Sequence, residues 1–260
     1  MYWYDGELNE GEKICLSIDA PELCYGASVF STMRVYQDSL NHPLTAWQKH
    51  CDRLQVSLQS FAWQQPDWQR VKKGATSLSK YFPVLRMAIF PNGKEWIIGR
   101  NLPTDLQQRQ TEGITAWVAR DNIYRRELPQ HKTGNYLGAY LARNRALSLD
   151  AQEAILIDDR DYWLETSTGN LWGWRDGCWY TPKLDSGILP GIGRSQLFDY
   201  LLEHNYQVTE NIWTPDFVVT LEAIAYSNCV VGTIPIKQVI DQHVMSSYPI
   251  VKLPQLNSDR

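Results

Sequence analysis

The stretch His131-Lys132-Thr133-Gly134-Asn135-Tyr136 lies directly ahead of a run with helical periodicity, from about Tyr136 to Leu147. Two further segments follow it, Glu165-Thr166-Ser167-Thr168-Gly169-Asn170 and Leu189-Pro190-Gly191-Ile192-Gly193-Arg194, and the second of them opens another helix. A lysine before a helix is usually a solvated surface residue, and strand-end glutamates and Gly/Pro loops are common. Their order and spacing, taken together, indicate a more specific arrangement.

A lysine, a carboxylate and a glycine-rich helix start are the groups that a protein needs to hold pyridoxal phosphate (PLP). Lys132 would form the Schiff base, for which its amine must be desolvated and neutral. Glu165 would face the pyridine nitrogen and keep it protonated. The amides near 191–193 would receive the phosphate at the positive end of a helix dipole. Tyr136 could hydrogen-bond the phenolic oxygen of the cofactor.

The composition narrows the classes of function. The 260 residues are 43% hydrophobic and 21% charged, which is enough chain for one large or two modest domains. A net charge of -4 without a basic stripe argues against a nucleic-acid partner. We expect no signal peptide, and no apolar run approaches the roughly 18 residues of a membrane span. Five scattered cysteines without a CxxC pair favour a cytoplasmic protein without a metal site.

Strand-rich segments punctuated by a few helices predict an α+β (mixed α/β) fold. The polar stretch 102–112 shows no clear period, and we interpret it as the connection between two domains, residues 1–108 and 109–260. The other expected elements are a short strand or hairpin at 8–18, a strand at 27–36, helices from 43 and over 67–81, a hairpin of 84–91 and 95–99 around Asn92-Gly93, a strand at 114–119, three or four short strands between 153 and 180, a helix over 192–204, and strands near 208, at 223–227 and at 236–240.

The chain resembles the class IV (fold type IV) PLP-dependent aminotransferase family, which contains branched-chain and D-amino acid aminotransferases and 4-amino-4-deoxychorismate lyases. The resemblance covers nearly the whole chain, because its pieces recur in order. They are Tyr25–Arg34, like the YGDGVFET-type opening, His50–Leu54, like the HxxRL helix, and then the segments 132–136, 165–170, 180–182, 191–194 and 227–235.

The resemblance implies a small N-terminal α/β domain, a larger C-terminal domain with a barrel-like sheet, PLP in the cleft between them, and a homodimer. Carried over by motif, Lys132 would be the Schiff-base lysine, in the larger domain, and Glu165 the partner of the pyridine nitrogen. Arg53 and the amides of Ile192 and Gly193 would hold the phosphate.

Two departures from the family pattern concern the phosphate. The family's GITR is Gly-Ile-Gly-Arg here, so Gly193 lacks a hydroxyl and offers only its amide. Cys229 stands where aminotransferases often carry a second phosphate-binding threonine, which again leaves the backbone.

The segment Asn228–Pro235 is more similar to the lyase pattern NSLxGxxPV than to the transaminase pattern TxxEITPV. Phe30–Arg34 resembles the lyase's FxTxR and lacks the glutamate that many transaminases place after the aromatic residue. Against this, the lyase's glycine-rich, arginine-containing segment after the strand at Val84 is missing.

We therefore favour a lyase of the folate pathway that converts 4-amino-4-deoxychorismate to 4-aminobenzoate and pyruvate. The alternatives are a transaminase of branched-chain or D-amino acids with 2-oxoglutarate, and a catalytically idle dimeric binding protein on the same fold. Thr32 is expected to line the substrate pocket. Arg34, Arg86 or Arg120 is expected to bind a substrate carboxylate, although each also fits a surface charge at a strand edge.

Overall fold

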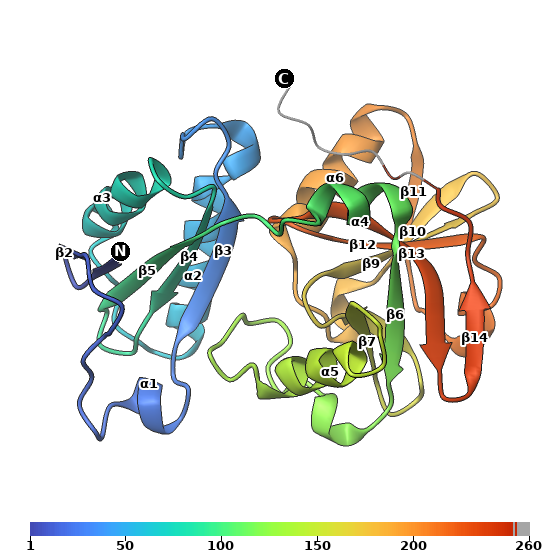
Figure 1. The fold of residues 1–260 in the computed structure, drawn as a ribbon, viewed down its shortest axis with the longest axis horizontal. Coiled ribbons are helices and arrows are strands. Elements are labelled where there is room, and N and C mark those ends of the chain that lie inside the picture. Colours follow the sequence, from blue (N-terminus) through green and yellow to red (C-terminus); the bar gives the residue numbers. More distant parts are fainter. Residues whose placement is uncertain (252, 254–260) are drawn as a thin grey trace. The chain divides into compact units, whose positions relative to one another are not determined.

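The computed structural model describes residues 1–251 and 253. The chain forms two compact units, each with its own sheet (Figure 1). Unit 1 contains Met1–Leu102 and His131–Asn135, so the segment with Lys132 packs with the N-terminal part of the chain. Unit 2 contains Pro103–Gln130 and the described residues from Tyr136 onward.

Residues 102–112, interpreted from the sequence as the connection between two domains, contain the helix α4, Leu106–Glu112. Its sequence is rich in glutamine, arginine and glutamate, which favour helix without giving an apolar period. Only Leu106 of the helix is buried, and Gly113 ends it with a φ of 68°. The boundary expected after residue 108 lies inside this helix, whereas the compact units divide at Leu102 and Pro103.

Unit 1 is built on an antiparallel sheet with the strand order β2-β1-β5-β4-β3. Helices α2 and α3 pack on it, and Leu54, Leu58, Val71 and Leu78 bury their side chains in its core. The elements are β1 Tyr2–Tyr4, β2 Glu7–Asn9, α1 Pro21–Cys24, β3 Val29–Arg34, a 3-10 turn Pro43–Thr45, α2 Trp47–Ser60, α3 Trp68–Ser79, β4 Val84–Ile89 and β5 Glu95–Arg100.

Local chemistry accounts for most of these bounds. The hairpin of β4 and β5 turns at Gly93, whose φ of 76° suits glycine. Helix α3 begins after Asp67, whose carboxylate accepts hydrogen bonds from the amides of Gln69 and Arg70. Of the short strand or hairpin expected at 8–18, only the start is regular, as part of β2, and residues 10–18 form no strand.

In unit 2, six strands of the described chain close into a barrel in the order β9-β12-β13-β6-β7-β8, with β8 pairing back to β9. This confirms the predicted α+β fold with a barrel-like C-terminal sheet. The elements are α4, β6 Ile114–Ala119, a 3-10 turn Asn122–Tyr124, α5 Leu137–Leu147, β7 Glu153–Ile157, β8 Trp163–Thr166, β9 Asn170–Arg175, β10 Cys178–Pro182, a 3-10 turn Leu184–Ser186, α6 Ile192–Glu203, β11 Gln207–Asn211, α7 Pro215–Val218, β12 Ala223–Asn228, β13 Gly232–Asp241 and β14 Val244–Ser247.

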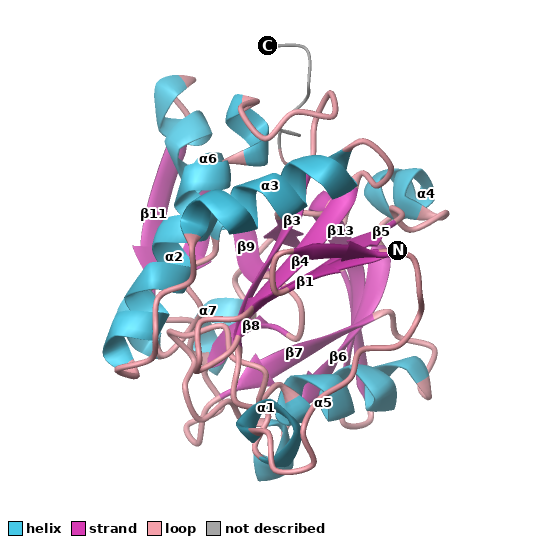
Figure 2. Cartoon of the chain, turned by 90° about the vertical axis from the view of Figure 1, so that its left-hand side faces the viewer, coloured by secondary structure: helices cyan, strands magenta, loops and turns pink. Residues whose placement is uncertain are grey.

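Two helices cover the barrel strands of unit 2. Helix α5 lies along β6 and β7 (Figure 2) and presents the small side chains of Ala139, Ala142 and Ala146 to them. Helix α6 packs Leu197 and Leu201 against an aromatic cluster on β9 and β10. In the described part of the chain no helix is long and apolar enough to cross a membrane.

Candidate active site

The backbone around Lys132 is held along the edge of β3 in unit 1. The amide of Phe30 donates to the carbonyl of Lys132 at 2.8 Å, and the amide of Gly134 donates to the carbonyl of Ser28 at 2.7 Å. A side chain at Gly134 would collide with the carbonyl of Gly26 and with Ser28 Oγ. The close approach therefore requires glycine and fixes the direction in which Lys132 leaves the backbone.

Phe30 lies between two cations of unit 1. The Lys132 Nζ is 4.8 Å from the centre of the Phe30 ring, and the Arg86 guanidinium carbon is 3.6 Å from the same centre. Both distances are in the range of cation–π contacts. Thr32 is directly opposite Arg86 in the pairing of β3 with β4, so these three side chains and Phe30 share one stretch of sheet.

The other two candidate arginines have different surroundings. Arg34 stacks on Tyr36, with 4.8 Å between the guanidinium carbon and the ring centre. Arg120 of unit 2 makes two 2.7 Å hydrogen bonds to Asp241 and one of 2.6 Å to Asp161. Arg120 is therefore already paired with two carboxylates of unit 2.

Arg53 is held by a short network of side chains that the sequence did not indicate. Its Nη2 donates to Ser31 Oγ at 2.6 Å, and Ser31 Oγ lies 2.6 Å from His50 Nδ1. Burial holds the pKa of His50 well below its usual range, and the charges of Arg53 and Lys132 add to the effect. A neutral His50 accepts the hydroxyl proton of Ser31, which leaves the hydroxyl oxygen to accept from Arg53.

The spacing His50-x-x-Arg53 places both side chains on one face of α2. Ser31 reaches them from β3, across 22 residues of sequence. The local spacing was therefore a readable signal for the histidine, whereas nothing local pointed to the serine.

In unit 2, Glu165 is 4% exposed at the end of β8. One carboxylate oxygen is paired with Arg126, and the other accepts the amide proton of Leu189 at 3.1 Å. The residue lines a cavity of about 250 Å³. Tyr136, at the start of α5, donates its hydroxyl proton to the carbonyl of Ser167 at 2.8 Å.

Asn170 links the segment of Glu165 to the loop that leads into α6. Its Nδ2 donates to the carbonyl of Leu189 at 2.9 Å, and its Oδ1 occupies the space that a side chain at Gly191 would need. The position of the helix start therefore depends on a glycine at 191 and on this asparagine.

The first turn of α6 has the geometry of an anion cradle. The described residues provide no side-chain cap at Gly191, so the first amides, including those of Ile192 and Gly193, point out of the helix end without an intrahelical acceptor. A Cβ at Gly193 would lie 2.9 Å from the carbonyl carbon of Asn228 and 3.0 Å from the nitrogen of Cys229. These first-turn amides beside a second backbone turn fit the phosphate of PLP.

Asn228 shapes that second turn. Its Oδ1 accepts from the amides of Val230 and Val231 at 2.9 and 3.0 Å. Its Nδ2 donates to the carbonyl of Thr168 at 3.2 Å, so the segments after Glu165 and before Cys229 are tied together.

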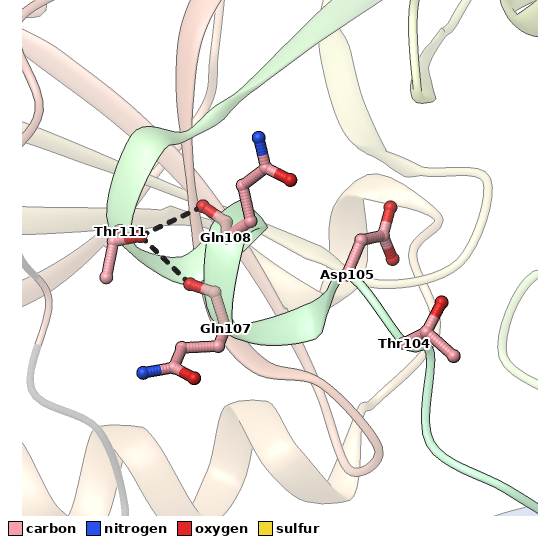
Figure 3. Close-up of a pocket in the computed structure, with 5 residues that line it drawn as sticks. All are labelled: Thr104, Asp105, Gln107, Gln108 and Thr111. Atoms are coloured by element: carbon pink, nitrogen blue, oxygen red, sulfur yellow. Dashed lines mark hydrogen bonds between the residues drawn. The ribbon is translucent and has the colours of Figure 1, made fainter.

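A different hollow, of about 490 Å³, lies along α4 and involves none of the predicted site residues. Figure 3 shows the hydroxyl of Thr111 donating to the carbonyls of Gln107 and Gln108, at 3.0 and 3.1 Å. Its lining is polar and comes from α4 and the two residues before it, Thr104 and Asp105, with no nucleophile paired to a base among them. Among the residues that the structure describes, no cluster of His, Cys, Asp and Glu could hold a metal ion.

The sequence model of "Amino-transferase class IV" matches residues 28–239. A branched-chain-amino-acid aminotransferase of Pseudomonas aeruginosa is 24% identical over 260 residues, with 92% of this chain and 84% of the relative covered. An aminodeoxychorismate lyase of Vibrio harveyi is 23% identical over 245 residues, with coverages of 88% and 89%. The solved 4-amino-4-deoxychorismate lyase of Pseudomonas aeruginosa has a TM-score of 0.80 at 18% identity, covering 97% of this chain and 95% of its own.

Proposed function

This chain belongs to the class IV aminotransferase family and is a PLP-dependent enzyme, and we propose that it is a lyase that converts 4-amino-4-deoxychorismate to 4-aminobenzoate and pyruvate. The observation that carries the proposal is the serine at position 31. It stands where many transaminases have a glutamate, so a neutral Ser31–His50 pair fixes Arg53. The buried surroundings of Arg53 are thus built without the negative charge of that glutamate, which suits a site that receives a substrate with two carboxylates.

Bound PLP supplies an aldehyde for an amine and, when its pyridine nitrogen is protonated, an electron sink. Lys132 would hold that aldehyde through its Nζ and, when released from it, would remove the ring proton of the substrate. The enolpyruvyl group would leave with its bonding electrons and take up a proton to become pyruvate. Glu165 would accept a charge-assisted hydrogen bond from the protonated pyridine nitrogen.

The phosphate is assigned to Arg53 and to the amides of Ile192, Gly193 and Cys229. The start of α6, which has no side-chain cap among the described residues, supports this assignment, because first-turn amides and the helix dipole favour an anion. Tyr136 is assigned to the phenolic oxygen of the cofactor, and its hydroxyl proton would then turn away from the carbonyl of Ser167.

For the substrate carboxylate we propose Arg86, with Thr32 beside it. The shared contact with Phe30 supports Arg86, because it brings a guanidinium to the ring that Lys132 also contacts. Arg34 is the weaker candidate, since it contacts Tyr36 instead. We further propose that the enzyme works as a homodimer, which sedimentation would test.

Transamination between an amino acid and 2-oxoglutarate is the second candidate. The branched-chain-amino-acid aminotransferase of Pseudomonas aeruginosa, which matches 92% of this chain, favours it. In that reaction Lys132 would carry a proton between two carbons instead of starting an elimination.

Two assays on the purified enzyme with PLP distinguish the candidates. One supplies 4-amino-4-deoxychorismate and measures 4-aminobenzoate and pyruvate, and the other supplies branched-chain and D-amino acids with 2-oxoglutarate and measures glutamate. We expect the first product pair, lost in Lys132→Ala and retained in the control Lys73→Ala on α3. Glutamate without 4-aminobenzoate would overturn the lyase. PLP binding without turnover in either assay would indicate an idle scaffold.

A further inference from the structure

We propose that Arg126 is a positioning residue that holds the Glu165 carboxylate by an ion pair, so that it can accept the pyridinium proton of the cofactor. The proposal rests on the role assigned to Glu165 under the proposed function. Arg126 follows the 3-10 turn Asn122–Tyr124 and belongs, like Glu165, to unit 2. The sequence motifs of the family did not point to it.

The ion pair is buried on both sides. The Arg126 side chain is 9% exposed and the Glu165 side chain 6%. Arg126 holds Oε1, and the amide of Leu189 holds Oε2 at 3.1 Å. Two donors from separate segments therefore bind the two oxygens and fix the orientation of the carboxylate. Each oxygen keeps a lone pair for one more donor.

Arg126 is itself kept in place by the site. Its guanidinium carbon is 5.6 Å from the centre of the Tyr136 ring, and the hydroxyl of that tyrosine is bonded to the carbonyl of Ser167. The planar guanidinium thus lies between Glu165 and an aromatic face, an arrangement that a flexible ammonium reproduces only in part.

The positive charge of Arg126 keeps the buried Glu165 carboxylate ionised. A buried carboxylate that loses its cation keeps an uncompensated charge, and it relieves that cost by taking up a proton. A protonated Glu165 no longer draws a proton onto the pyridine nitrogen. The other charged residues around the same cavity are Arg125, Asp158 and Asp159. Arg125 is exposed and the other two are acidic, so none of them replaces Arg126 in the buried contact.

The test is a double-mutant cycle read by the affinity for PLP, measured by equilibrium dialysis of the apo-enzyme. Arg126→Met and Glu165→Gln are each expected to weaken binding by about tenfold. The double variant is expected to bind no more weakly than Glu165→Gln alone, because Arg126 acts through Glu165. Arg126→Lys is expected to stay within about threefold of wild type. Arg160→Met, which removes an exposed ion pair to Asp158 beside the same cavity, is the matched control and should change nothing.

Additive losses in the cycle, or wild-type affinity in Arg126→Met, would refute the role of Arg126. If circular dichroism shows that Arg126→Met does not fold, Arg126→Lys provides the test. A folded Arg126→Lys protein that loses as much affinity for PLP as Glu165→Gln does would overturn the proposal. Wild-type affinity in Glu165→Gln would instead refute the role of Glu165 itself. None of these readings depends on whether the enzyme is a lyase or a transaminase.

Discussion

Replacing Gly193 by alanine sets two effects of opposite sign against each other. Alanine favours helix over glycine by roughly 0.5–1 kcal/mol, which would stabilise the first turn of α6. The new Cβ, however, would lie 2.9 Å from the carbonyl carbon of Asn228 and 3.0 Å from the nitrogen of Cys229. Both atoms belong to backbone, so relief requires a shift of the turn, and overpacking of this kind costs about 1–3 kcal/mol.

The cost of the close contact should exceed the gain in helix propensity. We therefore expect Gly193→Ala to lower the free energy of unfolding by about 1–2 kcal/mol after the helix gain is subtracted. We also expect PLP binding to weaken by about tenfold or more, because hydrogen bonds to charged groups contribute roughly 1.5–3 kcal/mol each. Urea unfolding of the apo-enzyme measures the first effect and equilibrium dialysis the second. Gly11→Ala is the control, because its Cβ would meet only the nitrogen of Lys13, at 4.0 Å. A Gly193→Ala protein as stable as wild type with unchanged affinity would refute the close approach of α6 to the 228–229 turn.

Three further predictions concern His50, Cys51 and Arg86. The folded pKa of His50 is lowered, so the unfolded chain binds more protons, and stability should fall as the pH drops below about 6.5. Urea unfolding at pH 5 and pH 7 should show a smaller difference for His50→Gln than for wild type, and an equal difference would contradict the prediction. Burial raises the pKa of the Cys51 thiol to about 12, so iodoacetamide should label the exposed Cys15 but not Cys51 in the native enzyme, as peptide mass spectrometry would show. Arg86→Leu should raise KM by about tenfold or more with a smaller effect on kcat, whereas Arg34→Leu should change KM by less than about threefold. A larger KM effect for Arg34→Leu would reverse the assignment.

The sequence predicted those elements whose periodicity is local. Strand β6 has the predicted bounds, Ile114–Ala119, because a β-branched apolar run follows a glycine. Helix α5 begins one residue later than expected, at Leu137. Helix α4 was missed because its polar residues favour helix without an apolar stripe. Closure of the barrel depends on the pairing of Glu165 with Asn170, which no local pattern shows.

The contacts around the candidate site show the same limit. Motif order proposes Lys132 and Glu165 for the site, because the family's segments recur in sequence. It could not show that Ser31 fixes Arg53, or that Arg126 pairs with Glu165, since these contacts span 22 and 39 residues. Long-range pairs of this kind depend on tertiary packing, which single-sequence patterns do not contain.

The two departures from the family pattern at the proposed phosphate site, Gly193 and Cys229, are connected in the structure, because the backbone at one position packs against the backbone at the other. A threonine at position 193 would place its Cβ against the backbone of Asn228 and Cys229, where glycine leaves room for close approach. Loss of the side chain and approach of the turn therefore belong together. The phosphate ligands proposed in unit 2 are then backbone amides at a helix start without a side-chain cap among the described residues. Because amides bind through fixed backbone geometry, affinity for the phosphate should depend on the turn that Asn228 holds rather than on the thiol of Cys229. Asn228→Ala should accordingly weaken PLP binding more than Cys229→Ala, and the opposite order in equilibrium dialysis would show that the thiol itself is a ligand.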